Sequence, residues 1–364
     1  MIKEIEIRNF KSIKHLDIRL RPINILIGSN GVGKSNFIEI FKLLNQIYEQ
    51  KLQEYIGNDI DSLLYFGRKK SDFLKMLLFF ETKNQEDNIL LAITLSARKN
   101  SNTGYLSEVI GSNVIKNKEE EAKRNTISVG TINNESRLKE KDFPILLPIQ
   151  SHLESFKIYH FHDTSNTSPL KAPSQINDNR YLAENGRNLA AYLYYLQEKH
   201  PKSFKQLEFI VRSVAPFFDK FDLQPDRLNE KQIELRWQEK GSDFPFSAYH
   251  LSDGTLRFIA LATLFLQPEP PKIIIIDEPE LGLHPFAIHK LAGLIKKASV
   301  SSQIIVSTQS VTLVDNFSAD DIITVDRKEK QSVFTLQTSE NLENWLKEYT
   351  IGDIWNKNVI GARP

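Results

Sequence analysis

Apolar runs bounded by polar turns alternate along the chain with stretches of helical spacing. Residues 273–276 (IIII) are apolar at every position, residues 23–27 (INILI) are apolar except at Asn24, and a third run lies within 302–310 (SQIIVSTQS). Strands that are apolar on both faces are typical of a parallel sheet covered by helices. Residues 37–44 (FIEIFKLL) and 255–266 (TLRFIALATLFL) have the pattern of helices. The sequence therefore predicts an α/β fold with a mixed or parallel central sheet.

The middle of the chain, residues 51–245, has a different pattern. Residues 89–97 predict a strand, 205–218 a helix, and Leu189, Leu193 and Leu196 the apolar side of another helix. Residues 233–239 (IELRWQE) alternate as a half-buried strand does. Residues 113–141 are polar and of mixed charge, and we expect a solvated or mobile excursion there. Because no heptad persists, we expect an α+β insertion that forms a compact lid.

Composition narrows the class of protein only slightly. The chain has 364 residues, with 47 Lys plus Arg against 46 Asp plus Glu, so its net charge indicates no partner. It contains no cysteine, which excludes disulfides and thiolate zinc sites. The first residues lack the apolar core of a signal peptide, and no window is apolar for long enough to span a bilayer. We expect a cytoplasmic protein with no membrane contact.

The stretch GSNGVGKSN, residues 28–36, joins the apolar run 23–27 to the helix that follows. It fits the pattern GxxxxGK[ST] through Gly28, Gly33, Lys34 and Ser35, in the strand–loop–helix context that phosphate binding requires. Glycines let backbone N–H groups surround phosphate oxygens, Lys34 reaches the outer phosphates, and the Ser35 hydroxyl can bind Mg²⁺. We predict a nucleoside triphosphate site whose binding residues are Asn30, Gly31, Gly33, Lys34, Ser35 and Asn36.

Two acids, Asp277 and Glu278, follow the isoleucine run directly. Ligands of open α/β sheets bind at the carboxyl ends of the strands, so both acids are expected beside the phosphates. We predict that Asp277, with Ser35, binds Mg²⁺ and that Glu278 activates the attacking water. The third run ends in Ser307, Thr308 and Gln309, which we expect at the same edge.

The order of these motifs resembles that of ABC-type ATPase heads. Residues 251–256 (LSDGTL) resemble the LSGGQ signature, with Ser252 and Gly254 at its serine and second glycine. The start IKEIEIRNFKSIKHLDIRL and the turn DEPELGLHP (277–285) look like the RecF/SMC/OLD branch and its stand-alone bacterial relatives, predicted ATPases of the AAA_21 type without a Toprim domain. The resemblance implies a P-loop NTPase fold, with ATP and Mg²⁺ as cofactors.

The resemblance also implies a division of the chain and an oligomer. The head would comprise residues 1–50 and 246–335, around the insertion 51–245 and before a tail at 336–364. ATP would be held between two heads, with Ser252 and Gly254 completing the partner's site in a homodimer or higher oligomer. Gln309 stands where the family usually has a switch histidine, and as a catalytic residue it can still hydrogen-bond the γ-phosphate or the attacking water. Because it cannot carry a titratable proton, we expect slow hydrolysis or a long-lived ATP-bound dimer. Gln150 is a weak candidate for the Q-loop glutamine.

Two functions remain open at this point. The resemblance implies a DNA-related ATPase switch, in repair or anti-phage defence, with a nuclease or other effector supplied by a second chain because too few residues follow Asp277 for a Toprim domain. The alternative is a regulatory or sensor subunit that binds no DNA and whose ATP state holds or releases a toxin. A membrane-transporter ATPase fits the generic motifs but not the N-terminal pattern or the long insertion.

Three further features have ordinary interpretations beside functional ones. His160, His162 and Asp163 could bind a metal, but a structural or nucleotide-proximal role is favoured because no third ligand pattern supports a site. Residues 67–70 (GRKK) could touch a nucleic-acid backbone, or could simply form a solvated loop. The tail, with Leu342, Trp345 and Leu346 at helical spacing, is expected to pack on its own domain rather than to dock a partner.

Overall fold

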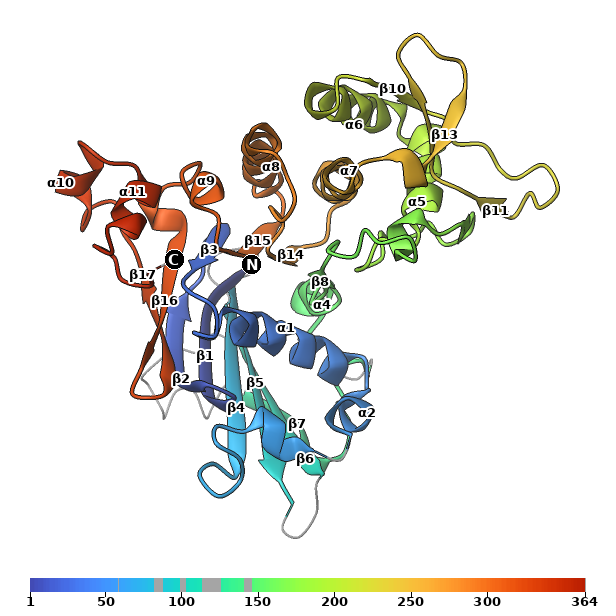
Figure 1. Cartoon of the computed structure of the whole chain (residues 1–364). Coiled ribbons are helices and arrows are strands. Elements are labelled where there is room, and N and C mark those ends of the chain that lie inside the picture. Colours follow the sequence, from blue (N-terminus) through green and yellow to red (C-terminus); the bar gives the residue numbers. More distant parts are fainter. Residues whose placement is uncertain (58, 82–87, 99–102, 113–125, 141–145, 364) are drawn as a thin grey trace.

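The computed structural model describes residues 1–57, 59–81, 88–98, 103–112, 126–140 and 146–363. Within this part of the chain two six-stranded sheets lie on either side of one helix, α1 (Lys34–Tyr48), as Figure 1 shows. No helix in the described ranges is long and apolar enough to cross a membrane.

The central sheet has the order β17-β16-β3-β15-β14-β8 and is parallel except at β17. Its strands are β17 (Gln331–Leu336), β16 (Ile322–Lys328), β3 (Ile23–Ile27), β15 (Gln303–Thr308), β14 (Ile273–Asp277) and β8 (Ile158–Tyr159). The three apolar runs are adjacent inner strands, β3, β15 and β14, which confirms the predicted α/β fold.

The isoleucines of β14 show why a strand here is apolar on both faces. Ile273 and Ile275 pack in the core that contains α1, whereas Ile274 and Ile276 pack in the opposite core with α7 (Asp253–Leu266) and α8 (Pro285–Ala298). All four side chains are buried. Each buried aliphatic side chain contributes about 1.5–3 kcal/mol of transfer free energy, so this strand anchors both layers.

The second sheet is antiparallel and has the order β2-β1-β4-β5-β6-β7. Its strands are β2 (Ile13–Arg19), β1 (Ile2–Phe10), β4 (Phe73–Glu81), β5 (Asn88–Ala97), β6 (Gly104–Ser112) and β7 (Thr126–Asn133). Four of these strands come from the segment predicted as a lid, and β8 of the same segment joins the central sheet. Residues 51–245 therefore contribute to both large sheets, and the domain boundaries at 50 and 245 remain a prediction.

The prediction of a solvated or mobile excursion at 113–141 is wrong for residues 126–140. Residues 126–133 form the edge strand β7, and Ser136 and Leu138 just beyond it are buried, so this portion is no solvated excursion. The buried Glu108 carboxylate accepts hydrogen bonds from Ser136 Oγ and the backbone N–H of Arg137, which ties this polar segment to β6. Residues 113–125 lie outside the described part of the chain.

A smaller α+β unit precedes the signature stretch (Figure 1). The predicted helices are α5 (Leu189–Lys199) and α6 (Pro201–Val214), and they pack with β10 (Phe218–Phe221), β12 (Arg236–Glu239) and β13 (Pro245–Ser247). The single strand predicted at 233–239 is wrong: β11 (Gln232–Ile233) pairs with β9 (Ser174–Gln175), while β12 pairs with β10 and β13. The alternating burial of Ile233, Leu235 and Trp237 is nevertheless present.

Five further short α-helices lie in the described part of the chain. They are α2 (Leu52–Ile56), α4 (Leu147–Leu153), α9 (Val311–Val314), α10 (Glu343–Leu346) and α11 (Ile351–Asn356). The tail packs on its own head: Trp355 is fully buried, Gly352 N–H donates to Asp315 Oδ1 at 2.7 Å, and Ala362 N–H donates to Asp326 Oδ1 at 2.9 Å.

Candidate nucleotide site

The phosphate loop between β3 and α1 is packed so tightly that only glycine fits at two positions. A Cβ on Gly28 would lie 2.3 Å from the carbonyl oxygen of Val325, and one on Gly33 would lie 2.1 Å from Ser332 Oγ. Gly33 also has φ of 117°, a conformation that side chains strongly disfavour. The loop is therefore shaped by its contact with β16 and β17, about 300 residues away in the sequence.

Lys34 is the first residue of α1 and extends back across the loop. Its Nζ donates hydrogen bonds to the carbonyl oxygens of Gly28, at 2.5 Å, and Ser29, at 3.0 Å. Burial lowers the pKa of Lys34, and the nearby carboxylates of Glu278 and Asp277 oppose that shift. The ammonium group thus lies between the loop backbone and the acids at the end of β14.

The next two residues of α1 have different environments. Ser35 is exposed in the first turn, where its hydroxyl is accessible to a metal ion. The side-chain amide of Asn36 instead donates to Ser12 Oγ at 2.6 Å, and Ser12 Oγ in turn lies 2.6 Å from Ser332 Oγ. The Asn36 side chain thus connects the helix to the turn between β1 and β2, which the sequence did not indicate.

The register of the sheet brings the predicted catalytic residues to one edge. Asp277 is opposite Ser307 on β15, and Thr308 is opposite Ile27, the residue before the phosphate loop. The backbone N–H of Glu278 donates to the Ser307 carbonyl at 2.8 Å, which fixes Glu278 at a positive φ of 44°. Burial raises the pKa of the Asp277 carboxyl, and the neighbouring Glu278 adds to the shift.

Gln309 directly connects the phosphate loop to the acidic residues that follow β14. Its Nε2 donates to Glu278 Oε1 at 2.5 Å and to Asn30 Oδ1 at 2.8 Å. One amide thus bridges the residue predicted to activate water and the phosphate loop. Among Asn30, Glu278 and Gln309, it is Gln309 that contacts both of the other two residues.

The signature residues lie at the amino terminus of α7. The Ser252 side chain caps the helix by accepting a hydrogen bond from Thr255 N–H at 3.2 Å. A Cβ on Gly254 would lie 2.5 Å from the carbonyl oxygen of Gly282, so the signature packs closely on the turn that follows Glu278. Within the described residues, no hydrogen bond connects Ser252 or Gly254 to the phosphate loop of the same chain.

Arg257, one turn further along α7, was not predicted. Its guanidinium donates to the carbonyl oxygens of Phe161, at 2.9 Å, and His162, at 2.7 Å. Burial, followed by the charge of Arg257, lowers the pKa of His162, while Asp277 and Glu278 oppose the shift. The segment after β8 therefore lies near the catalytic edge, which favours the nucleotide-proximal interpretation of His162.

The alternative of a metal site at His160, His162 and Asp163 gains no support. The prediction assumed a strand, but β8 ends at Tyr159, so the two imidazoles do not alternate on one strand face. Asp163 instead accepts hydrogen bonds from Ser165. No group of three His, Asp or Glu residues suited to a metal occurs in the described ranges.

Gln150 lies on α4, where its side-chain amide donates to Glu154 Oε1 at 3.2 Å. At residues 67–70, Arg68 is paired with Asp61 at 2.9 Å, whereas Lys69 and Lys70 are exposed. Neither feature contacts the phosphate loop through a hydrogen bond found in the described part of the chain.

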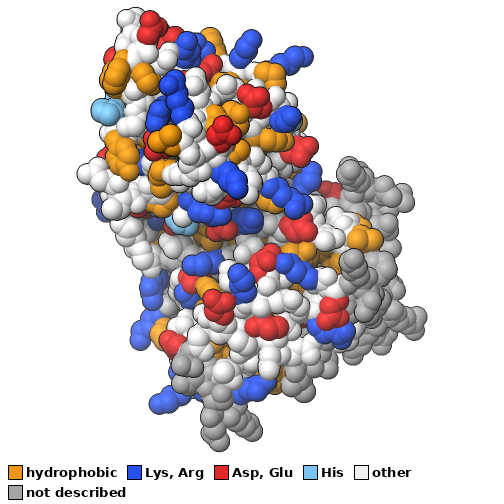
Figure 2. Space-filling view, turned by 90° about the vertical axis from the view of Figure 1, so that its right-hand side faces the viewer, with side chains coloured by type: hydrophobic (Ala, Val, Ile, Leu, Met, Phe, Trp, Pro, Cys, Tyr) orange, Lys and Arg blue, Asp and Glu red, His pale blue; other side chains and the backbone are white. Residues whose placement is uncertain are grey.

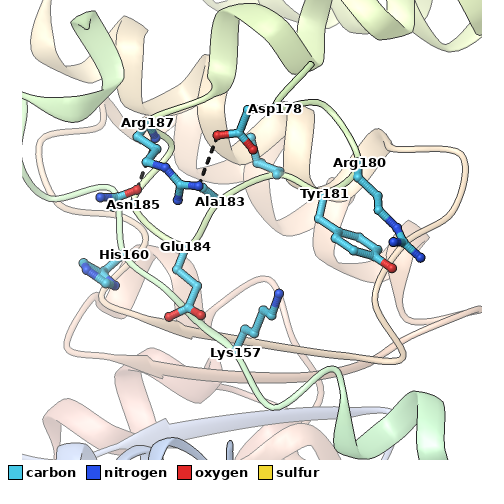
Figure 3. Close-up of a pocket in the computed structure, with 10 residues that line it drawn as sticks. Lys157, His160, Asp178, Arg180, Tyr181, Ala183, Glu184, Asn185 and Arg187 are labelled. Atoms are coloured by element: carbon cyan, nitrogen blue, oxygen red, sulfur yellow. Dashed lines mark hydrogen bonds and ion pairs between the residues drawn. The ribbon is translucent and has the colours of Figure 1, made fainter. Parts of the chain in front are cut away.

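A separate pocket of about 400 Å³ is lined by Lys157, His160 and the segment 178–187 (Figure 3). Arg187 pairs with Asp178 at 3.1 Å, and Glu184 lies between Lys157 and His160. An adjoining pocket shares Lys157 and Arg180 and also contains Glu154, Glu269 and Lys272. Each pocket is lined by one more Lys or Arg than Asp or Glu, an excess too small to indicate the charge of a ligand.

The sheet, the phosphate loop, the acidic pair and the capped signature helix together define a P-loop ATPase of the ABC type. The chain belongs to the family described as "AAA domain, putative AbiEii toxin, Type IV TA system", whose model matches residues 23–315.

Two characterised proteins and a solved structure are similar to this chain. An ATP/GTP phosphatase of Helicobacter pylori is 21% identical over 78% of the chain and 77% of that protein. The Old nuclease of Escherichia phage P2 is 24% identical over 95% of the chain, which spans 62% of the nuclease. An Smc head domain from Pyrococcus furiosus, bound to the C-terminal domain of ScpA, has the same fold with a TM-score of 0.60, 17% identity and coverage of 95% of this chain and 98% of that one.

Proposed function

We propose that the protein is an ATP-driven switch in which two copies enclose two ATP molecules and separate after hydrolysis. The observation that carries the proposal is the bridge from Gln309 to both Glu278 and Asn30, because it joins the water-activating carboxylate to the phosphate loop. Residues that act on a γ-phosphate must converge within hydrogen-bond distance of it, and these three already lie together.

The roles of the residues follow from their positions. The loop amides and Lys34 bind the triphosphate, with the amino terminus of α1 adding its positive dipole end. The exposed Ser35 hydroxyl and the Asp277 carboxylate offer the hard oxygen donors that Mg²⁺ prefers, and the bound ion would neutralise phosphate charge. Glu278 accepts a proton from the attacking water, while Gln309 orients that water through its amide.

The second copy completes the site through Ser252 and Gly254. At the start of α7 Ser252 is exposed and Gly254 is half-buried, and within the described residues neither is hydrogen-bonded to the phosphate loop of its own chain. The amino terminus of a helix that is fourteen residues long attracts anions, so α7 of one copy would face the γ-phosphate on the other. Dimerisation would then depend on ATP, and larger oligomers could form through an additional partner.

The biological process we favour is DNA-related, as repair or anti-phage defence, with a nuclease or toxin effector on another chain. The similarity to a phage nuclease supports this role. The family description, which includes a toxin, supports the alternative of a sensor subunit that binds no DNA. On the face in Figure 2 basic and acidic side chains are interspersed, so a DNA-binding surface there would have no single charge sign.

The test is phosphate release and oligomer mass with ATP, with and without duplex DNA, at low and at physiological salt. DNA that stimulates turnover in a salt-sensitive way supports the DNA-related role. If DNA changes neither turnover nor mass at low salt, the sensor function is the better account.

A further inference from the structure

Glu280 lies two residues after Glu278 in the turn that leaves β14. Its side chain points into the molecule and is only 8% exposed. Oε1 accepts hydrogen bonds from the Thr308 hydroxyl and, at 3.2 Å, from the backbone N–H of Gln309. The Glu280 carboxylate therefore binds the backbone of Gln309, the residue whose side chain bridges Glu278 and Asn30.

The turn that contains Glu280 also reaches the signature. Leu283 N–H donates to the Glu280 carbonyl at 3.0 Å, and this turn carries Gly282 at a φ of 72°. The Gly282 carbonyl is the group that lies against Gly254. A single residue thus contacts the Gln309 loop through its side chain and shapes the turn under the signature through its backbone.

Core stability does not explain a carboxylate at this position. Glu280 Oε2 is buried and has no hydrogen-bond partner among the described residues, and burial raises the pKa of the group. Burying a carboxylate costs several kcal/mol of free energy. Hydrogen bonds to Oε1 alone offset only part of this cost. A cost of this kind at the edge of an active site points to a role in the site.

We propose that Glu280 is a positioning residue that holds Gln309 against Glu278 and links it to the turn beneath the signature, and so sets the rate of ATP hydrolysis. The inference rests on the proposed function, because it takes Glu278 and Gln309 as the hydrolytic pair. Glu280 touches neither nucleotide nor water in this account and acts through Gln309.

The direct test compares Glu280→Ala with Glu280→Gln in phosphate release, together with binding of a fluorescent ATP analogue. Misplacing a water-orienting group costs roughly 10–100-fold in rate, so Glu280→Ala should lose about that much kcat with KM within about 3-fold of wild type. Glu280→Gln should recover most of the rate, since its amide oxygen can accept the same two hydrogen bonds. A purely structural role would lower the fraction of folded protein but leave the kcat of that fraction unchanged.

Thr308→Val provides a second test if Glu280→Ala does not fold. It removes the hydroxyl that donates to Glu280 with little change of shape and should lower kcat in the same direction. Thr263→Val is the matched control, because its buried hydroxyl donates within its own helix, to the Ile259 carbonyl at 2.7 Å, and has no other hydrogen-bond partner among the described residues. Glu278→Gln is measured in parallel. If it is inactive while Glu280→Ala and Thr308→Val turn over like wild type, the inference is wrong and the proposed function stands; if Glu278→Gln itself is active, the proposed function fails.

Discussion

The side-chain amide of Gln309 donates to the Glu278 carboxylate at 2.5 Å, although the two residues follow different strands, β15 and β14. Their strands are adjacent and parallel, so this contact is set by the sheet rather than by the loops. The same amide reaches Asn30 at 2.8 Å. One side chain therefore joins the residue proposed to activate water to the loop proposed to bind phosphate.

Replacing Gln309 by alanine should lower phosphate release by roughly 10–100-fold, because the attacking water loses its orienting hydrogen bond. Affinity for ATP should change little, since Lys34 and the loop amides remain. Gln150→Ala is the control, as that glutamine bonds Glu154 on α4. Equal rates for Gln309→Ala and wild type would remove Gln309 from the mechanism.

The two glycines of the phosphate loop allow a matched comparison. Gly31 and Gly33 both have positive φ, of 77° and 117°, but a Cβ on Gly31 has nothing within 4 Å whereas one on Gly33 meets Ser332 Oγ. Gly33→Ala should therefore lower the free energy of unfolding by about 1–3 kcal/mol more than Gly31→Ala. Urea unfolding measures the difference, and equal losses would show that the loop does not depend on its contact with β17.

Much of this site could be predicted from the sequence because its signals are local. The phosphate loop, the acids after β14 and the Ser252 cap each lie within a short stretch whose neighbours fix its conformation. Other contacts could not be predicted, because they join segments that are far apart in the sequence or involve a side chain that belongs to no recognised motif. They are the contacts of Ser332 with the loop, of Arg257 with residues 161–162 and of Glu280 with Gln309. The sequence also did not indicate that β4, β5, β6 and β7 join the β1–β2 sheet, because pairing between strands leaves no trace in the spacing within either strand.

Two helix caps allow the effect of a substitution on stability to be distinguished from its effect on dimerisation. Ser252 and Thr350 each accept a hydrogen bond from the backbone N–H three residues later, from Thr255 and Asp353 respectively. Alanine at either position should lower the free energy of unfolding by about 0.5–2 kcal/mol. Only Ser252→Ala should also weaken ATP-dependent dimerisation, as measured by the protein concentration at half-dimerisation. Equal weakening in both variants would indicate a general loss of stability instead.

His152 should make the stability of the fold depend on pH. Burial, together with the positive amino terminus and Lys272, lowers its pKa from 6.5 to about 4. As the pH falls below 6.5 the unfolded chain binds a proton that the folded chain does not, so the free energy of unfolding declines until about pH 4. The loss should be roughly 1–3 kcal/mol. His152→Gln should flatten this part of the pH profile in urea unfolding, and an unchanged slope would assign the dependence to other groups.

In the proposed mechanism two heads close on ATP and Glu278 activates the water. The most direct measurement is mass in solution for wild type and Glu278→Gln, each with and without ATP and Mg²⁺, alongside phosphate release. Glutamine keeps the shape of the side chain but cannot accept the proton, so turnover should fall by about 10²–10⁴-fold. We predict that this variant stays a smaller species without ATP and becomes a stable dimer or larger assembly with it. A variant that hydrolyses ATP like wild type, with no change of mass in either protein, would contradict the account.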